Sequence, residues 1–401
     1  MAFNASISGI NAAQQEMSVI SNNIVNAGTI GFKKGEAEFA ELFSSSMQSA
    51  EPGAGQGVEL TGIRSDFSQG EFQFTSSVLD LAIDGGGLFV LREGDSNLYS
   101  RAGAFRVDTQ GYIVNSSGLN LQGYQPDQNG ALTQAIGDLR ISTDLMDQRQ
   151  TSSVSFAGNV DSRAEASAVD FSIDDPLSYV SSSTTTIYDS AGEAHQLAIY
   201  FAKDAENPDT FNVYVAIDDV LRPEVGALTF DNAGVLSEDS VTTIDIAGFA
   251  PDGADVMDFS IDLSDTSSFG TDSGAVAFTQ DGYPAGELLS FEFDDSGTLY
   301  STYTNGEIRA QGQLILASFI NPSQLRPSGN TNYAQSEGSG APTLGAPSSG
   351  ARGFIRPSAL ETANVDITQE LLALIEAQRN FQSNAQAIQN EDEATRSIQQ
   401  L

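Results

Sequence analysis

Cysteine and tryptophan are absent from the 401-residue sequence, and histidine occurs only once. Without thiols, the chain can form no disulfide, no Cys-ligated zinc site and no thiol nucleophile. The single histidine, His195, stands in a strand-like segment and leaves no conventional catalytic triad. We therefore predict no catalytic, cofactor-binding or metal-binding residues, and we expect a protein that is not an enzyme.

Basic side chains are also scarce. Lys and Arg number 17 against 54 Asp and Glu, and the formal net charge is −37. Such an excess of negative charge repels nucleic-acid phosphates and anionic membrane surfaces. We expect no nucleic-acid partner, and self-assembly must overcome repulsion between copies through apolar burial or counterions.

No segment is apolar enough to span a bilayer. The first ten residues carry neither the basic leader nor the unbroken apolar core of a secretory signal peptide. We expect no membrane insertion, and export of the protein would follow a route without a cleaved signal peptide.

Both ends of the chain show helical periodicity. Apolar residues recur at helical and heptad spacing over residues 3–25 and 362–400, and Asn364 and Asp366 are candidate caps for the second segment. The predicted seams, which we interpret as a polymerisation interface, consist of Phe3, Ile7, Ile10, Met17, Ile20, Ile24, Ile367, Leu371, Leu374, Phe381, Ala385 and Ile388.

Charge is nearly missing from the first of these segments. Between Met1 and Ile30 the only charged side chain is Glu16, and the other polar positions are amides and hydroxyls. One interpretation is an ordinary helix pair within the chain. The other is packing against further copies, where uncharged faces avoid like-charge repulsion. The pattern alone leaves both open.

Between the ends the periodicity becomes strand-like. Short β-branched and aromatic runs are separated by Asp-x-x-Gly turns, in which Asp bonds its own backbone and Gly supplies a positive φ. Four such turns lie at residues 107–112, 188–192, 230–235 and 293–298. This pattern predicts an all-β middle, whereas residues 328–353, rich in Gly, Ser, Pro and Ala, read as an irregular connection.

Acidic residues are concentrated in one part of that middle. The segment 151–280 holds 23 acidic and three basic residues, so its formal charge is −20. A solvated outer domain explains this concentration.

Several segments carry a recognisable pattern. Residues 21–33 (Ser-Asn-Asn-Ile-Val-Asn-Ala-Gly-Thr-Ile-Gly-Phe-Lys), 79–90 and 99–105 are followed at the far end by 363–366 and 378–385. In this order they resemble the flagellar axial proteins, the family of rod and hook subunits. Ala363 stands where that family usually has Ser, and Phe381 where Tyr is common. The matching motif residues are Asn22, Asn23, Asn26, Gly31, Phe32, Asn364, Asp366, Gln378 and Arg379.

The resemblance implies a mainly β fold with α-helical termini, in which the N- and C-terminal helices pair as a coiled-coil-like domain. Two successive β domains follow, the outer one inserted in the inner one. We expect a helical polymerisation domain (1–30 and 363–401), an extended connector (31–75), an inner β domain (76–147 and 281–362) and an outer acidic β domain (148–280).

The large insertion favours a hook subunit over the shorter rod subunits. The resemblance then implies a protein exported to the bacterial flagellum, outside the cell, that polymerises with itself into a flexible tube. Its expected partners are rod and hook–filament junction proteins, a hook cap and the flagellar export apparatus.

Three alternatives remain at this point. One is a rod subunit of the same family. Another is a secreted β-rich adhesin or calcium-binding protein, although the Asp-rich turns lack a twelve-residue calcium loop with a terminal Glu. The third is an acidic glycosidase, for which abundant carboxylates are uninformative.

We predict that self-assembly strengthens with added salt, because screening weakens the repulsion between copies of charge −37. Light scattering of the purified subunit across a series of salt concentrations measures this effect. Stronger assembly at low salt would contradict the prediction.

Overall fold

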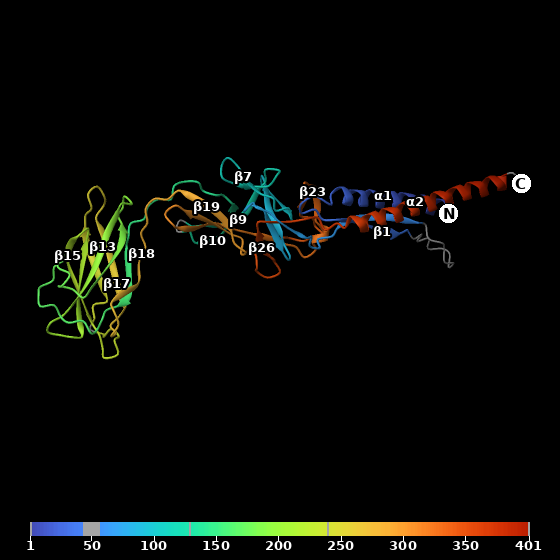
Figure 1. The fold of residues 1–401 in the computed structure, drawn as a ribbon. Coiled ribbons are helices and arrows are strands. Elements are labelled where there is room, and N and C mark those ends of the chain that lie inside the picture. The colour runs from blue at the N-terminus through green and yellow to red at the C-terminus, as the bar shows by residue number, and fades with distance from the viewer. Residues whose placement is uncertain (1, 43–56, 128–129, 239, 400–401) are drawn as a thin grey trace. The chain divides into compact units, whose positions relative to one another are not determined.

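The computed structural model describes residues 2–42, 57–127, 130–238 and 240–399. It divides into two compact units (Figure 1). Unit 1 comprises Met1–Ser142, Ser290–Ser301 and Ile308–Leu401, and unit 2 comprises Thr143–Leu289 and Thr302–Glu307.

The terminal helices of unit 1 lie where the apolar periodicity predicts them. Helix α1 spans Ala2–Val25 and helix α2 spans Ile367–Gln399. Strands β1 (Gly35–Glu41) and β2 (Val58–Ser65) form an antiparallel pair that packs against α1. The expected combination of a mainly β fold with paired terminal helices is confirmed.

The rest of unit 1 is built around one large sheet. Its main path runs β19 (Leu288–Phe293), β20 (Thr298–Tyr303), β21 (Ile308–Leu314), β9 (Asn120–Pro126), β5 (Leu88–Glu93), β6 (Ser96–Ser100), β24 (Asn332–Ala334) and β23 (Arg326–Gly329). Beside this path lie β7 (Arg106–Val107), β8 (Ile113–Val114), β10 (Leu132–Asp138), β22 (Leu316–Ser318) and β25 (Thr343–Gly345), and a 3₁₀ turn at Pro322–Gln324. Residues 328–353, expected to be irregular, therefore contain strands, because their backbone completes the sheet edge.

Two short strand pairs bring the two ends of the chain together. Strand β3 (Phe72–Phe74) pairs with β27 (Ala359–Glu361), and β4 (Leu81–Asp84) pairs with β26 (Phe354–Pro357). The C-terminal segment thus reaches α2 alongside strands from the first quarter of the chain.

Unit 2 contains two four-stranded sheets. The first has the order β16 (Thr243–Phe249), β17 (Met257–Ser267), β11 (Ser153–Asn159), β18 (Gly274–Gln280), and the second β12 (Ser181–Tyr188), β13 (Ala194–Lys203), β14 (Thr210–Ile217), β15 (Val220–Thr229). Side chains from both sheets, among them Phe156, Phe201 and Phe211, share one buried core. The unit is therefore a β-sandwich with a core of its own.

The Asp-x-x-Gly turns form as predicted. In the turn at Asp108, the carboxylate accepts the backbone N–H of Gln110 and of Tyr112, both at 2.8 Å. Gly111 adopts a φ of 88°, and the glycines of the other three turns are also in the left-handed region. Side-chain acceptor and permissive glycine together close each hairpin.

The structure contains, among its described residues, no helix long and apolar enough to cross a membrane. Within the same residues, no cluster of three or more His, Cys, Asp or Glu is arranged to hold a metal ion.

Candidate functional site

The two terminal helices form an antiparallel pair. Near the end of α1, Asn23 donates to Glu370 at the start of α2 (3.1 Å). Further along, Glu16 lies beside Glu376, and a Cβ placed on Gly9 would meet Asn384 at 2.8 Å. These three contacts are spaced seven residues apart on α1 and six to eight residues apart on α2. Such spacing is typical of two helices that pack as a coiled coil.

The predicted seam residues differ in how far this pair covers them. Ile20 is buried, together with its neighbour Val19 and with Ala377 on α2. The seam residues Ile7, Ile367 and Leu371 are exposed, and the side chain of Phe3 lies outside the described part of the chain. The half-buried seam residues are Ile10, Met17, Ile24, Leu374, Phe381, Ala385 and Ile388.

One face of α2 remains apolar and exposed. Ile367, Leu371 and Ile375 follow one another at four-residue spacing and are 47–50% exposed, and Leu372 beside them is 64% exposed. We call these four residues the α2 apolar face. Sequence reasoning missed Leu372 and Ile375, although the unbroken apolar run 371–375 covers more than one side of a helix and indicated a second face.

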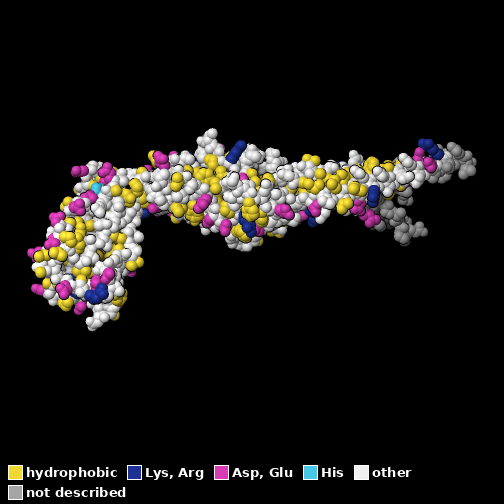
Figure 2. Space-filling model, in the orientation of Figure 1, with side chains coloured by type: hydrophobic (Ala, Val, Ile, Leu, Met, Phe, Trp, Pro, Cys, Tyr) yellow, Lys and Arg dark blue, Asp and Glu magenta, His cyan; other side chains and the backbone are white. Residues whose placement is uncertain are grey.

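Apolar side chains are also visible along the helix pair in Figure 2, whereas acidic side chains are spread over the surface of unit 2. Helix α1 carries a single charged residue, Glu16, and contributes little charge to the surface of the pair, whereas α2 carries five acidic and two basic residues.

Asn23 of the family motif joins three elements. It is 3% exposed, its Nδ2 donates to the carbonyl of Gly35 (2.9 Å) as well as to Glu370, and its Oδ1 accepts the N–H of Gly35 (2.9 Å). An aspartate or leucine could not both donate and accept in this way. The asparagine therefore fixes the end of α1 against β1 and α2.

Three buried charged side chains lie where the helix pair joins the β strands. We call Lys33, Arg101 and Glu361 the ion cluster. The Nζ of Lys33 is 2.6 Å from Oε1 of Glu361, and the Nε of Arg101 is 3.0 Å from Oε2. The three side chains are at most 4% exposed. Burial lowers the pKa of Lys33, and the carboxylate of Glu361 opposes that effect.

Backbone groups complete the ion cluster. Lys33 also donates to the carbonyl of Ser68, the N–H of Gly70 donates to Glu361, and the guanidinium of Arg101 donates to the carbonyls of Gly85 and Gly87. Buried charges are tolerated only when paired and hydrogen-bonded in this manner.

Other motif residues surround the same junction. Gly31 has a φ of 67°, and a Cβ at this position would lie 2.3 Å from the backbone nitrogen of Ala102, so a side chain does not fit there. The N–H of Gly31 donates to the carbonyl of Glu361, and the N–H of Lys34 donates to the side chain of Asn364 (both 2.8 Å).

Of the other motif residues, Asn22 lies on α1, Asn26 and Phe32 follow that helix, and Asp366, Gln378 and Arg379 lie on or beside α2. Asp366 caps the helix, accepting the N–H of Thr368 at 2.8 Å. Of the two candidate caps, Asp366 therefore takes this role, while Asn364 ties the strands together. Gln378 and Arg379 are exposed on α2.

His195 lies in unit 2 and joins two hairpin turns. Its Nδ1 is 2.6 Å from Asp218 and its Nε2 is 3.4 Å from Asp189. Burial acts to lower the pKa of His195, but the hydrogen bonds to these two carboxylates outweigh it and raise the pKa. This arrangement is that of a structural clamp between the β12–β13 and β14–β15 turns.

Comparisons with known proteins agree with this architecture. Four family models match: the flagella basal body rod protein (residues 3–33), the flagellar hook protein FlgE/F/G D1 domain (82–162), the flagellar basal body protein FlaE D2 domain (159–283) and the flagellar basal body rod FlgEFG protein C-terminal (356–401).

The flagellar hook proteins FlgE of Salmonella typhimurium and Escherichia coli are each 35% identical to the chain, over 100% of both sequences. The chain belongs to the flagellar hook protein family. The hook protein of Borreliella burgdorferi is 32% identical over 98% of both chains. Members of the hook protein family are structural subunits of the flagellum, and full-length similarity to hook proteins favours a hook subunit over a rod subunit.

A solved structure shares the fold. The crystal structure of the Helicobacter pylori flagellar hook protein FlgE2 matches with a TM-score of 0.57 and 15% identity, covering 72% of this chain and all of that one.

We predict that Glu361→Gln lowers the free energy of unfolding of unit 1 by about 3–5 kcal/mol, because it leaves two buried cations without their anion. Urea unfolding of the monomer measures the loss. The matched control is Glu36→Gln, which removes the carboxylate of an exposed ion pair with Lys34 and Arg64 and should cost at most about 1 kcal/mol. If the two variants lost the same free energy of unfolding, the prediction that the buried ion cluster stabilises unit 1 would be wrong.

A second prediction concerns pH. Burial, and then the neighbouring carboxylate of Glu376, raise the pKa of Glu16 above its ordinary value. The charged form is thus disfavoured in the folded helix pair, so the pair gains stability as pH falls through the raised pKa toward the unfolded value of about 4.3.

Helical circular dichroism of wild type and Glu16→Gln between neutral and mildly acidic pH measures this gain. The variant should be more helical at neutral pH and should lack part of the pH response. Glu376→Gln should lower the pKa of Glu16 while leaving the effect of burial. A wild-type response identical to that of Glu16→Gln would refute this assignment.

Proposed function

We propose that copies of this chain polymerise into the flagellar hook through the exposed faces of their terminal helices. The α2 apolar face carries the proposal: four large apolar side chains on one helix are each about half exposed or more. A surface helix of a folded protein normally turns such a stripe inward. A neighbouring copy offers this face a partner that its own chain does not.

The energetic argument is one of apolar burial against charge repulsion. Fully burying a large aliphatic side chain contributes about 1.5–3 kcal/mol, so covering a half-exposed one contributes roughly 1 kcal/mol. Four such residues contribute about 4 kcal/mol per subunit toward association, and every copy along a polymer repeats that contribution. The near absence of charge on α1 limits the repulsion that α1 of a neighbouring copy would exert, whereas the acidic residues of α2, such as Glu370 and Glu376, oppose contact between two α2 helices.

Unit 2 is proposed to supply the flexible outer part of the tube. Its residues 151–280 carry a formal charge of −20. Contacts between such acidic surfaces are polar and hydrated, and they are weaker than apolar contacts. We propose that they slide past one another while the helices hold, which lets the hook bend as a joint between rod and filament.

The cellular setting follows from the same assignment. We propose that the protein is exported to the outside of the cell by the flagellar export apparatus and assembles under a hook cap. It then contacts rod proteins at one end and hook–filament junction proteins at the other. Membership of the hook protein family supports this setting.

We predict that the double variant Leu371→Gln/Ile375→Gln folds but assembles poorly. Loss of two apolar contacts per subunit should raise the critical concentration for polymerisation at least about tenfold, equivalent to roughly 1.4 kcal/mol. Sedimentation of polymer and electron microscopy measure assembly, and circular dichroism of the monomer checks the fold.

The matched control is Ser383→Gln, which changes an exposed polar residue of the same helix. It should assemble as wild type does. A double variant that polymerises at the wild-type concentration would show that this face is not the assembly surface.

A further inference from the structure

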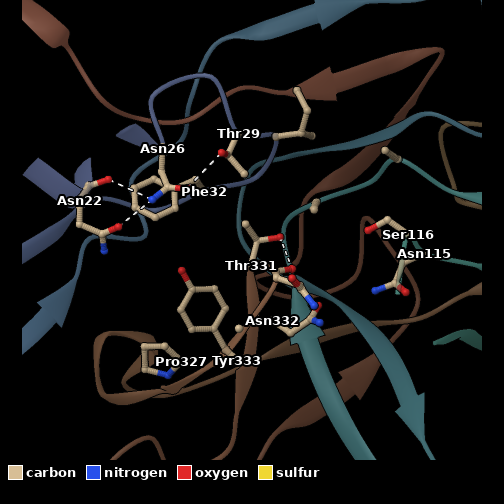
Figure 3. A pocket seen from close by; sticks show the side chains of 15 residues that line it. Asn22, Asn26, Thr29, Phe32, Asn115, Ser116, Pro327, Thr331, Asn332 and Tyr333 are labelled. Atoms are coloured by element: carbon tan, nitrogen blue, oxygen red, sulfur yellow. Dashed lines mark hydrogen bonds between the residues drawn. The ribbon is translucent and has the colours of Figure 1, made fainter. Parts of the chain in front are cut away.

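A groove of about 520 Å³ opens in unit 1 beside the end of α1 (Figure 3). Figure 3 shows Asn22, Asn26 and Phe32 on one side of it and Asn115 and Ser116 on the other. The hairpin formed by β23 and β24 lies between them. The groove therefore joins three parts of the chain that are remote in sequence.

The groove is uncharged. None of its fifteen lining residues is Asp, Glu, Lys, Arg or His, although 18% of the chain is charged. Five of the fifteen are asparagines. A nucleic acid or another anion finds no cation here, and a metal ion finds no carboxylate. The surface is suited instead to a partner that is neutral and forms many hydrogen bonds.

One buried acceptor in the lining has no partner. Asn332 is 5% exposed, and its Oδ1 has no hydrogen-bond partner among the described residues. Most buried polar atoms in proteins are hydrogen-bonded, so an orphaned one requires an explanation. The Oδ1 atom is itself enclosed, so an incoming donor reaches it only if the turn between β23 and β24 shifts on binding.

Other lining groups are free to meet the same segment. The Oδ1 of Asn115 accepts the N–H groups of Ser117 and Leu119, and its amide nitrogen faces the groove (Figure 3). Asn22 accepts from Asn26 through its Oδ1, which leaves its own NH₂ as a donor. An extended backbone carries both donors and acceptors, and its carbonyl groups can accept from these two amide groups.

The turn at the groove is held in an uncommon conformation. Asn330 and Thr331 have φ values of 49° and 58°. A β-branched residue such as Thr is strongly disfavoured in this left-handed region, where Gly is preferred. Thr331 lines the groove, and its hydroxyl donates to the carbonyl of Asn330 (2.6 Å); a glycine at this position would relieve the turn but would lose that bond.

We propose that this groove docks an uncharged, extended segment of a second copy of the chain. The proposal rests on the proposed function and adds a second contact to it. Asn22 and Asn26 belong to α1 and its end, so the groove is continuous with the helix pair through which copies are proposed to associate. For a chain of net charge −37, a neutral groove is a place where two copies meet without facing carboxylates.

A photo-crosslinking amino acid at Ser116, on the exposed rim, tests the occupant. On irradiation of polymer, we expect an adduct to another copy of the chain that is absent from monomer. The same amino acid at Ser96, exposed in the same unit but outside the groove lining, is the control and should give far less. Polymer without a Ser116 adduct, or an adduct only to a glycan or a different protein, overturns the proposal.

Charge insertion gives an independent test. Ser116→Asp should raise the critical concentration for assembly at least about tenfold, equivalent to roughly 1.4 kcal/mol, whereas Ser96→Asp adds the same charge and should change it little. Thr331→Gly should keep the fold and also weaken assembly.

If both groove variants assemble like Ser96→Asp while Leu371→Gln/Ile375→Gln does not, the groove proposal is wrong and the helix proposal stands. If the helix variant also assembles normally, the proposed function itself fails.

Discussion

Glu361 is fully enclosed and faces two cations, Lys33 and Arg101, from different parts of the chain. A buried charge without its partner is costly, so these three groups are stable together and unstable apart. Lys33 follows α1, and Glu361 precedes α2. The direction in which both helices leave the β strands therefore depends on a single carboxylate. Asn23 adds a second constraint on the same helices, because its side chain bonds to β1 and to α2 at once.

Charge is distributed unequally between the parts of the molecule for which different roles are proposed. At the helix junction the charges of Lys33, Arg101 and Glu361 are buried and paired, the groove beside it has no charged lining residue, and residues 151–280 of unit 2 carry more than half of the net charge. Self-repulsion is therefore strongest at unit 2, where contacts are proposed to be weak. The apolar and amide-rich surfaces remain available for contacts that must hold.

Local features of the fold were predictable, and long-range ones were not. The helices at both ends and the Asp-x-x-Gly hairpins follow from spacing and turn chemistry within a few residues. By contrast, the pairing of β4 with β26 joins Ile83 to Ile355, and no local pattern specifies that partner. For the same reason residues 328–353 read as irregular, although β24 and β25 form in them once the sheet edge is present.

The same limit applies to the candidate site, where local sequence patterns do not specify long-range contacts. Lys33 and Arg101 stood in segments that resemble the family, and Glu361 stood two residues before another, yet nothing in their spacing indicated one buried cluster. The seams at the ends of the chain were predictable, but which seam residues face the partner helix was not. Ile20 is covered within the chain, whereas Leu371 is exposed, because the true register places Ala377 and not Leu371 against α1.

The segment that contains the sandwich of unit 2 begins and ends at neighbouring residues. The N–H of Met146 donates to the carbonyl of Gly286, and β11, the first strand of the sandwich, pairs with β18, the last. The two ends of this segment therefore lie side by side, and the sandwich has a core of its own. A change in the length of a loop within the segment can be absorbed inside the sandwich, without a shift in the residues on either side.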